Sequence, residues 1–238
     1  MAVCSSVRAG DAPPADNAIP TTLVFVANGS GDQDYVSDAM CSLSRNHHLP
    51  LCLRRVAWSR TGLGALDLHD KAGQKLAAQR LAACVLSEKS TNPRTPICLV
   101  GHSAGAHVVL LAAEQLPEGS VERIVLLAAA VSRQYDLRAA LRATCKGIDS
   151  YHSKTDCTLL AMEAACLTAD GRKALTAGRV GFAPACLSDP LYQNLRQHPY
   201  TPCMKQFEHN GGHYGWTRQP FLLSFIVPLL TPPNSEEH

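Results

Sequence analysis

The stretch Ile97-Cys98-Leu99-Val100-Gly101-His102-Ser103-Ala104-Gly105 decides the fold of this chain. Its first four residues form a short apolar run that predicts a buried strand, and the segment after Gly105, AHVVLLAAEQL, has the composition and spacing of a helix. Glycines two positions before and two positions after Ser103 leave room for neighbouring backbone in a sharp turn. The stretch therefore predicts a strand, a strained turn at Ser103, and a helix whose N-terminus points at the serine hydroxyl.

Strand-like and helix-like segments alternate along nearly the whole chain. Apolar runs bounded by turn residues predict strands at 21–27, 51–58, 97–101, 121–127, 147–152 and, more weakly, 205–208. Helical spacing predicts helices at 35–44, 66–87, 106–115, 137–145, 157–167 and 220–230. Alternation of this kind is typical of an α/β fold, in which a doubly wound, mostly parallel sheet carries helices on both faces.

The length of 238 residues favours one globular domain, which we place at 21–230 between a flexible N-terminal lead-in (1–20) and a flexible tail (231–238). The short connection at 128–146 leaves no room for a large cap domain, and any lid or insertion is expected at 157–204. No signal sequence is visible and the longest apolar runs are too short to cross a bilayer, so a cytoplasmic protein without a transmembrane segment is expected.

A net charge of +2, with scattered basic residues, lacks the footprint of a nucleic-acid binder and indicates a small-molecule partner. The ten cysteines contain no C-x-x-C pair, so we expect reduced thiols acting mostly as small core residues rather than a zinc site. The sequence suggests no metal or organic cofactor.

A serine nucleophile needs a base and an acid that follow it on loops at the same sheet edge. His213 lies in the pliable loop Asn210-Gly211-Gly212-His213-Tyr214-Gly215 and is the predicted base, with His209 and His198 as rivals. Asp156, just after the strand 147–152, is the predicted acid. Asp136 is the second choice, because Asp149 falls inside that strand.

Asp156 also directly precedes a predicted helix, so it has an alternative role as a helix cap. Backbone N–H groups of Ala104, after the serine, and of Gly29 or Ser30, after the first strand, are the candidate oxyanion hole. Among the few aromatic residues, those expected to line a modest pocket are Tyr35, Trp58, Tyr214 and Trp216.

GHSAG at 101–105, NGSGD at 28–32, SKTD at 153–156 and GGHYG at 211–215 together resemble the α/β-hydrolase superfamily over residues 21–230. The resemblance implies a Ser103–Asp156–His213 triad, no cofactor, and hydrolysis of a carboxylic ester through an acyl-enzyme. A thioesterase, an amidase, a peptidase, or a non-catalytic binding protein on the same fold remain alternatives. The HGGG stretch of some esterase groups is absent, so fold analogy does not choose the substrate.

Overall fold

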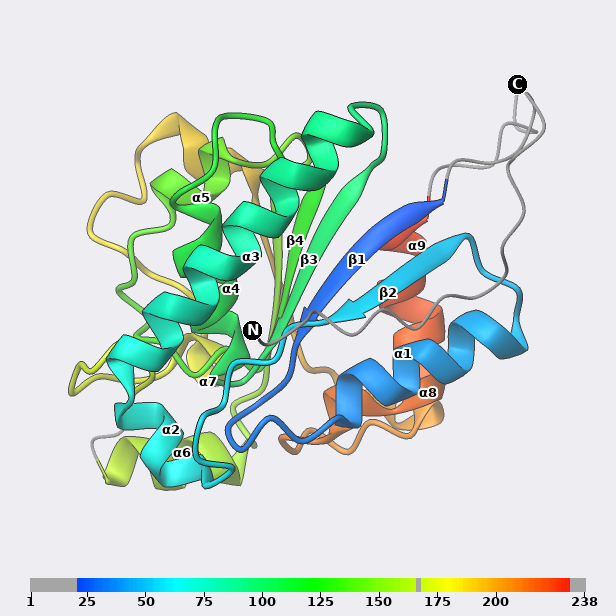
Figure 1. Cartoon of the computed structure of the whole chain (residues 1–238). Helices are drawn as coiled ribbons and strands as arrows, with labels where there is room; N and C mark the ends of the chain where they lie inside the picture. The colour runs from blue at the N-terminus through cyan, green and yellow to red at the C-terminus, as the bar shows by residue number, and fades with distance from the viewer. Residues whose placement is uncertain (1–20, 166–167, 232–238) are drawn as a thin grey trace.

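The computed structural model describes residues 21–165 and 168–231. The predicted lead-in at 1–20, nearly all of the predicted tail, and the last two residues of the helix expected at 157–167 lie outside this range. The described chain alternates strands and helices around one parallel sheet (Figure 1). The strands are β1 (Thr22–Ala27), β2 (Leu51–Arg55), β3 (Ile97–His102), β4 (Arg123–Leu127), β5 (Ile148–His152) and β6 (Leu195–Pro199).

The sheet has the order β2-β1-β3-β4-β5-β6, and every neighbouring pair is parallel. The order reverses between β1 and β3, because the chain first steps outward to β2 and then returns to build the other half. Loops leaving β1 and β3 diverge at such a switch point and leave a crevice at the carboxyl edge. The predicted doubly wound α/β fold is confirmed.

The helices cover both faces of the sheet. Those that precede β6 in the chain are α1 (Tyr35–Asn46), α2 (Gly64–His69), α3 (Lys71–Thr91), α4 (Gly105–Ala113), α5 (Arg138–Arg142), α6 (Cys157–Ala164) and α7 (Ala177–Val180). The C-terminal segment is α8 (Gln219–Phe221), the π-helical turn η4 (Leu222–Ile226) and α9 (Val227–Leu230). Figure 1 shows α3, α4 and α5 on one face, and α1, α8 and α9 on the other.

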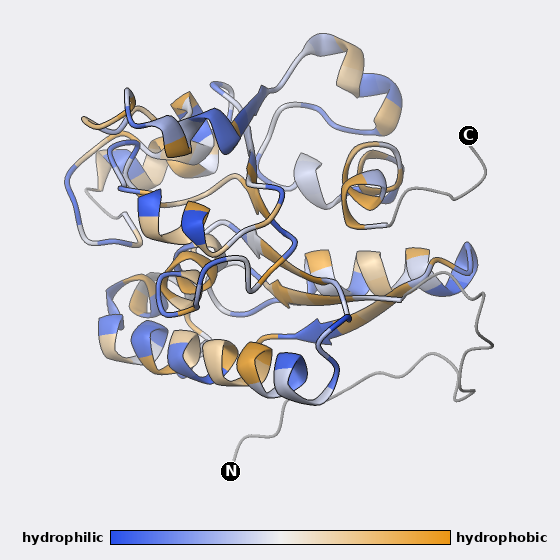
Figure 2. Cartoon of the chain, turned by 90° about the horizontal axis from the view of Figure 1, so that it is seen from above, coloured by the Kyte–Doolittle hydropathy of each residue, from blue (hydrophilic) through white to orange (hydrophobic). Residues whose placement is uncertain are grey.

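The core lies between these layers. The central strands β1 and β3 are buried along their whole length, and Figure 2 shows apolar strands between helices that alternate polar and apolar turns. Continuous burial explains why these strands read as unbroken apolar runs rather than as alternating patterns.

The sixth predicted strand, 205–208, is wrong. That region is the 3₁₀ helix η2 (Pro202–Phe207), and the sixth strand is β6, preceded by the 3₁₀ helix η1 (Pro190–Asn194). β6 is an edge strand with the sequence LRQHP, and none of its residues is fully buried. Because its residues are mostly polar, a search for apolar runs does not find this strand.

Two predicted helices are interrupted. The segment 66–87 divides at Asp70, whose carboxylate accepts from the N–H of Gly73 at 2.9 Å and so caps α3 as a new helix. The segment 220–230 contains the π-helical turn just before Pro228, a residue with no N–H to continue the helical hydrogen bonds. The predicted connection 157–204 also changes, because it contains β6.

Candidate active site

Ser103 occupies the sharp turn between β3 and α4 that the sequence predicts. Its φ is +54°, the left-handed region that non-glycine residues rarely adopt. A Cβ on Gly101 would lie 2.6 Å from Ala106 Cα, and one on Gly105 would lie 2.3 Å from the carbonyl oxygens of Ala27 and Asn28. Both glycines are therefore required by close backbone contacts, and the predicted strain at Ser103 is confirmed.

His213 and Asp156 form a buried hydrogen-bonded pair. The Nδ1 of His213 donates to Oδ2 of Asp156 at 2.7 Å, and both side chains are buried. Because a carboxylate only accepts, the proton of the neutral ring belongs on Nδ1, and Nε2 is left as an acceptor. An imidazole in this state can take a proton from a hydroxyl group.

Asp156 both binds His213 and caps a helix. Its other oxygen, Oδ1, accepts from the N–H of Leu159 at 2.9 Å and caps α6. The helix-capping alternative is therefore real, but it occupies one oxygen and leaves the second for His213.

The loop that carries His213 is tied to the loop that carries Asp156. The hydroxyl groups of Ser153 and Thr155 both donate to the carbonyl oxygen of Gly211, at 2.6 and 3.1 Å. Gly211 has a φ of +85°, and a Cβ there would lie 2.4 Å from Thr155 Oγ1. The SKTD turn thus fixes the position of His213 as well as that of the carboxylate.

The rival carboxylates are engaged elsewhere. Asp136 binds Arg138 and the Tyr192 hydroxyl, and the Arg138 bonds hold the pKa of Asp136 well below its usual range. Asp149 binds Arg123, Arg196 and His198. Burial alone would raise the pKa of Asp149, but these bonds outweigh it and lower the pKa.

The rival histidines, His198 and His209, are likewise held by partners away from Ser103. His198 is the partner of Asp149. His209 accepts from the N–H of Gly211 at 2.9 Å and packs its ring 3.9 Å from that of Trp216. Burial lowers the pKa of His209 to about 4.

His102 is a neighbour of the pair that sequence reasoning did not single out. Its Nε2 donates to the carbonyl oxygen of His213 at 3.3 Å, and the two rings lie 4.8 Å apart. Burial, together with the nearby His213, lowers the pKa of His102 to about 3. His102 therefore stays neutral and holds the backbone of His213.

The loop after β1 lies beside Ser103. A Cβ on Gly29 would lie 3.3 Å from Ser103 Cβ, so the backbone of this glycine passes close to the serine. Among the residues that the structure describes, no acceptor is found for the N–H groups of Gly29, Ser30 or Ala104. Free N–H groups at such a position can bind an oxyanion.

Asp67 is a further residue that the sequence gave no reason to select. It is 1% exposed, and its Oδ2 accepts from the N–H of Gly31 at 2.9 Å while Oδ1 accepts from the Thr61 hydroxyl at 2.8 Å. Burial acts to raise the pKa of Asp67, but the hydrogen bonds from Ser59, Thr61 and Gly31 outweigh it and lower the pKa. Asp67 thus anchors the loop 28–32 from α2.

A pocket of about 320 Å³ opens above the serine. It is lined by Gly29, Ser30, Gln33, Tyr35, Gly64, Leu68, Ser103, Thr158, Met162, His213 and Tyr214. The lining contains no Asp, Glu, Lys or Arg side chain, which suits an uncharged ligand. Thr158 and Met162 come from α6, so the predicted lid segment does contribute one wall.

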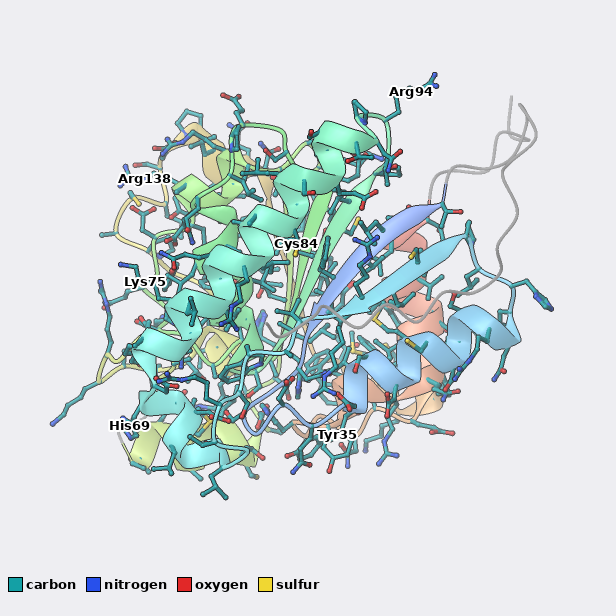
Figure 3. The ribbon with its side chains drawn as sticks, viewed as in Figure 1. Tyr35, His69, Lys75, Cys84, Arg94 and Arg138 are labelled. Carbon is teal, nitrogen blue, oxygen red and sulfur yellow. The ribbon has the colours of Figure 1, made fainter. Side chains whose placement is uncertain are left out.

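Two of the four aromatic residues expected at the pocket are elsewhere. Trp58 and Trp216 are buried in the core, and Trp58 donates its indole N–H to the carbonyl oxygen of Asn28. Tyr35 and Tyr214 do line the pocket, with their rings edge to face at 5.3 Å. Figure 3 places Tyr35 at the same end of the molecule as His69, and Arg94 at the opposite end.

The described cysteines are free thiols, and Cys4 and Cys166 lie outside the described residues. Of the eight described cysteines only Cys98 is fully buried, and burial raises its pKa to about 12. Cys41, Cys52, Cys84 and Cys186 are partly buried and pack against the core, as expected, whereas Cys145, Cys157 and Cys203 are exposed. Within residues 21–165 and 168–231, no cluster of ligands could hold a metal ion, and no helix is long and apolar enough to cross a membrane.

Comparisons with known proteins find similarity only at the level of three-dimensional structure. No family model matches the sequence, and no curated protein matches it. Esterase PE8 is 17% identical, with 84% of this chain and 88% of that chain covered, at a TM-score of 0.48. XC6422 from Xanthomonas campestris, described as an a/b serine hydrolase without lid, is 16% identical, with 93% and 88% covered, at a TM-score of 0.49.

A predicted hydrolase from Thermoplasma acidophilum is 13% identical, with 91% and 86% covered, at a TM-score of 0.48. The class of fold follows from this chain's own sheet. Six parallel strands in the order β2-β1-β3-β4-β5-β6, with a strained serine elbow between β3 and α4, make this an α/β-hydrolase fold without a large cap domain.

Proposed function

We propose that this protein is a serine hydrolase that cleaves carboxylic esters through an acyl-enzyme on Ser103. The observation that carries the proposal is the Nδ1–Oδ2 hydrogen bond of 2.7 Å between His213 and Asp156, at a pocket that Ser103 also lines. The strained backbone of Ser103 at the pocket that His213 also lines supports the proposal, because backbone strain of this kind is concentrated at functional sites.

In the proposed first step, Nε2 of His213 takes the Ser103 proton while Oγ attacks the ester carbonyl carbon. Asp156 stabilises the resulting imidazolium. The N–H groups of Ala104 and of Gly29 or Ser30 hold the negative oxygen. The imidazolium then gives its proton to the departing alcohol oxygen, and water, activated by the same ring, releases the acid.

The pocket supports an uncharged ester with a short acyl group. A volume of about 320 Å³ is at the lower end of the range for ligand sites, and Leu68 and Met162 supply apolar surface. A thioesterase, an amidase or a peptidase would use the same residues, and a non-catalytic binding protein would need none of the proton chemistry.

Turnover of p-nitrophenyl acetate, butyrate and octanoate by the parent protein and its Ser103→Ala variant tests this proposal. We expect hydrolysis by the parent, fastest for the two shorter esters, and none above background by the variant. Matched oxygen and sulfur esters, and an anilide, rank the competing activities. A folded parent that hydrolyses none of these compounds overturns the proposal.

A further inference from the structure

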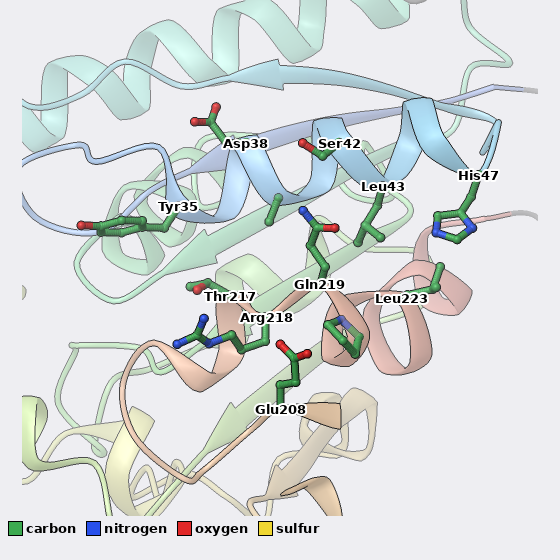
Figure 4. A pocket seen from close by; sticks show the side chains of 12 residues that line it. Tyr35, Asp38, Ser42, Leu43, His47, Glu208, Thr217, Arg218, Gln219 and Leu223 are labelled. Carbon is green, nitrogen blue, oxygen red and sulfur yellow. The ribbon is translucent and has the colours of Figure 1, made fainter. Parts of the chain in front are cut away.

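A second hollow lies beside the pocket at Ser103. It has a volume of about 720 Å³ and runs between α1 and the segment from Thr217 to Leu223, with Glu208 on its wall (Figure 4). We call it the α1–α8 groove. Figure 4 shows Tyr35, at the start of α1, and His47, just after the end of α1, at the two ends of the groove, and Glu208, Arg218 and Gln219 on the facing side.

Tyr35 joins the two hollows, because it lines both of them. Its ring meets that of Tyr214, the residue after the predicted base, and these side chains are 52% and 50% exposed. The Tyr35 ring is thus the wall that the two hollows share, and a ligand that extends from the pocket at Ser103 past this ring would reach the α1–α8 groove.

The two hollows differ in chemistry. The pocket at Ser103 is lined by no carboxylate, ammonium or guanidinium group, whereas the groove carries the carboxylates of Asp38 and Glu208 and the guanidinium of Arg218. Within the described part of the chain, none of these three forms an ion pair, and all are exposed. Ser42, Thr217 and Gln219 add further polar groups.

This lining places negatively charged hydrogen-bond acceptors and a positively charged hydrogen-bond donor in one groove. Carboxylates accept hydrogen bonds from hydroxyl groups, and the N–H groups of a guanidinium or an amide donate hydrogen bonds to hydroxyl oxygens. The charges nearly cancel, at a formal −1 with His47 neutral, so a neutral group with many hydroxyls matches the groove better than an ion does. The volume is ample for such a group, since ligand sites commonly span about 300–1,000 Å³.

We propose that the α1–α8 groove binds the alcohol part of the ester and that this part is a neutral polyol, while the acyl part occupies the pocket at Ser103. The inference rests on the proposed ester hydrolysis and adds the substrate class. In the reaction the bond between the acyl carbon and the polyol oxygen breaks, and His213 supplies the proton that leaves with the polyol.

Butyrate esters that differ only in the alcohol test the inference. We expect kcat/KM for glycerol monobutyrate to exceed that for n-propyl butyrate at least tenfold. In Arg218→Ala and Glu208→Gln this ratio should fall towards one. The matched controls Arg94→Ala and Glu118→Gln alter exposed charges that do not line the groove and should keep the parent ratio. Because the ratio compares two substrates of one variant, it does not depend on the fraction of folded protein.

Equal ratios in the parent and the groove variants overturn the inference. A parent that prefers the butyrate ester of choline or of glycolate overturns the neutral polyol class. Failure of the proposed function looks different, since then p-nitrophenyl butyrate is not hydrolysed either. In that case the groove is tested by calorimetry, which measures the binding of glycerol monobutyrate to Ser103→Ala and to the double variant that also carries Glu208→Gln. Weaker binding to the double variant supports the groove site. Equal binding to both proteins, or no binding to either, refutes it.

Discussion

Asp156 shows how one side chain can join the fold to the proposed chemistry. Its two oxygens are divided between the N–H of Leu159, at the start of α6, and Nδ1 of His213. Because α6 also lines the pocket through Thr158 and Met162, the carboxylate links one wall of the pocket to the proposed base. The two roles can be separated by substitution.

Asp156→Asn keeps a side-chain oxygen for Leu159, since Asn caps helices as well as Asp does. The amide cannot hold the imidazole in the same protonation state, so we expect kcat to fall on the order of 10³- to 10⁴-fold with nearly unchanged stability. Asp156→Ala should lose similar activity and also about 0.5–2 kcal/mol of stability through the lost cap. Kinetics and urea unfolding of both variants check this. Full activity in Asp156→Asn would remove Asp156 from the mechanism.

Asp67 is expected to act through the loop after β1. In Asp67→Ala the N–H of Gly31 loses its acceptor, so the free N–H groups of Gly29 and Ser30 are held less firmly. We predict a fall in kcat of roughly 10- to 100-fold with little change in KM, because the oxyanion exists only after attack.

Asp67→Asn should keep most of the parent kcat. Its remaining oxygen can still accept from the N–H of Gly31, while the Thr61 hydroxyl turns to accept from the side-chain amide. Thr61→Val, which leaves the Gly31 bond in place, is the matched control. A parallel loss in all three variants would mean that Asp67 only stabilises the fold.

The sequence pointed to Ser103, His213 and Asp156 because each follows a strand, or precedes a helix, in a short polar turn. The structure brings His213 and Asp156 into contact and puts Ser103 at the same pocket. Asp67 and His102 carry no such local signal, because their roles depend on partners 36 and 111 residues away. The Asp156–His213 pair also joins residues 57 positions apart, but both lie in polar turns that mark them, whereas nothing in the sequence marks the two other hydrogen bonds.

At the scale of elements, the packing of α4 against the end of β1 decides the shape of the elbow. The sequence predicted this junction because its glycines, its apolar strand and its apolar helix all agree. β6 was misplaced because an edge strand that pairs on one side carries Arg196 and His198 in place of an apolar run. The interrupted C-terminal helix was missed because its π-helical turn leaves the apolar spacing nearly unchanged.

Gly105→Ala tests the junction. A Cβ there would meet two carbonyl oxygens at 2.3 Å, so β1 and α4 must separate, and we expect a loss of about 1–3 kcal/mol in the free energy of unfolding. Gly62→Ala is the control: its φ is +70°, but no atom lies within 4 Å, so only backbone strain of about 1–2 kcal/mol is expected.

Denaturant unfolding gives the stability of both variants, and activity on p-nitrophenyl acetate reports on the elbow. Gly105→Ala should lose activity and Gly62→Ala should keep it. Equal activity in the two variants would contradict the close approach at Gly105.

At the scale of the whole molecule, buried neutral histidines couple stability to pH. Burial lowers the pKa of His102 to about 3, and those of His107 and His209 to about 4. An unfolded histidine takes up a proton near pH 6.5, so below that pH the unfolded state binds more protons. The free energy of unfolding must therefore fall as the pH falls.

Between pH 7.5 and 5.5 each of these histidines should lower the free energy of unfolding by about 1.4 kcal/mol. Urea unfolding at several pH values measures the total. His107→Gln can still form a hydrogen bond with Gln74, and it should reduce the change in the free energy of unfolding over this pH range by the contribution of one histidine. A stability that does not change over this range, or an unchanged slope in the variant, would contradict the buried neutral state.

The central claim is that Ser103 is a nucleophile activated by His213, and a fluorophosphonate probe tests it most directly. Intact-mass and peptide mass spectrometry of the treated parent should find one adduct, on the peptide that contains Ser103. Ser103→Ala should carry none, and a folded His213→Ala should react far more slowly. An adduct on another residue, or none on a folded parent, would contradict the claim.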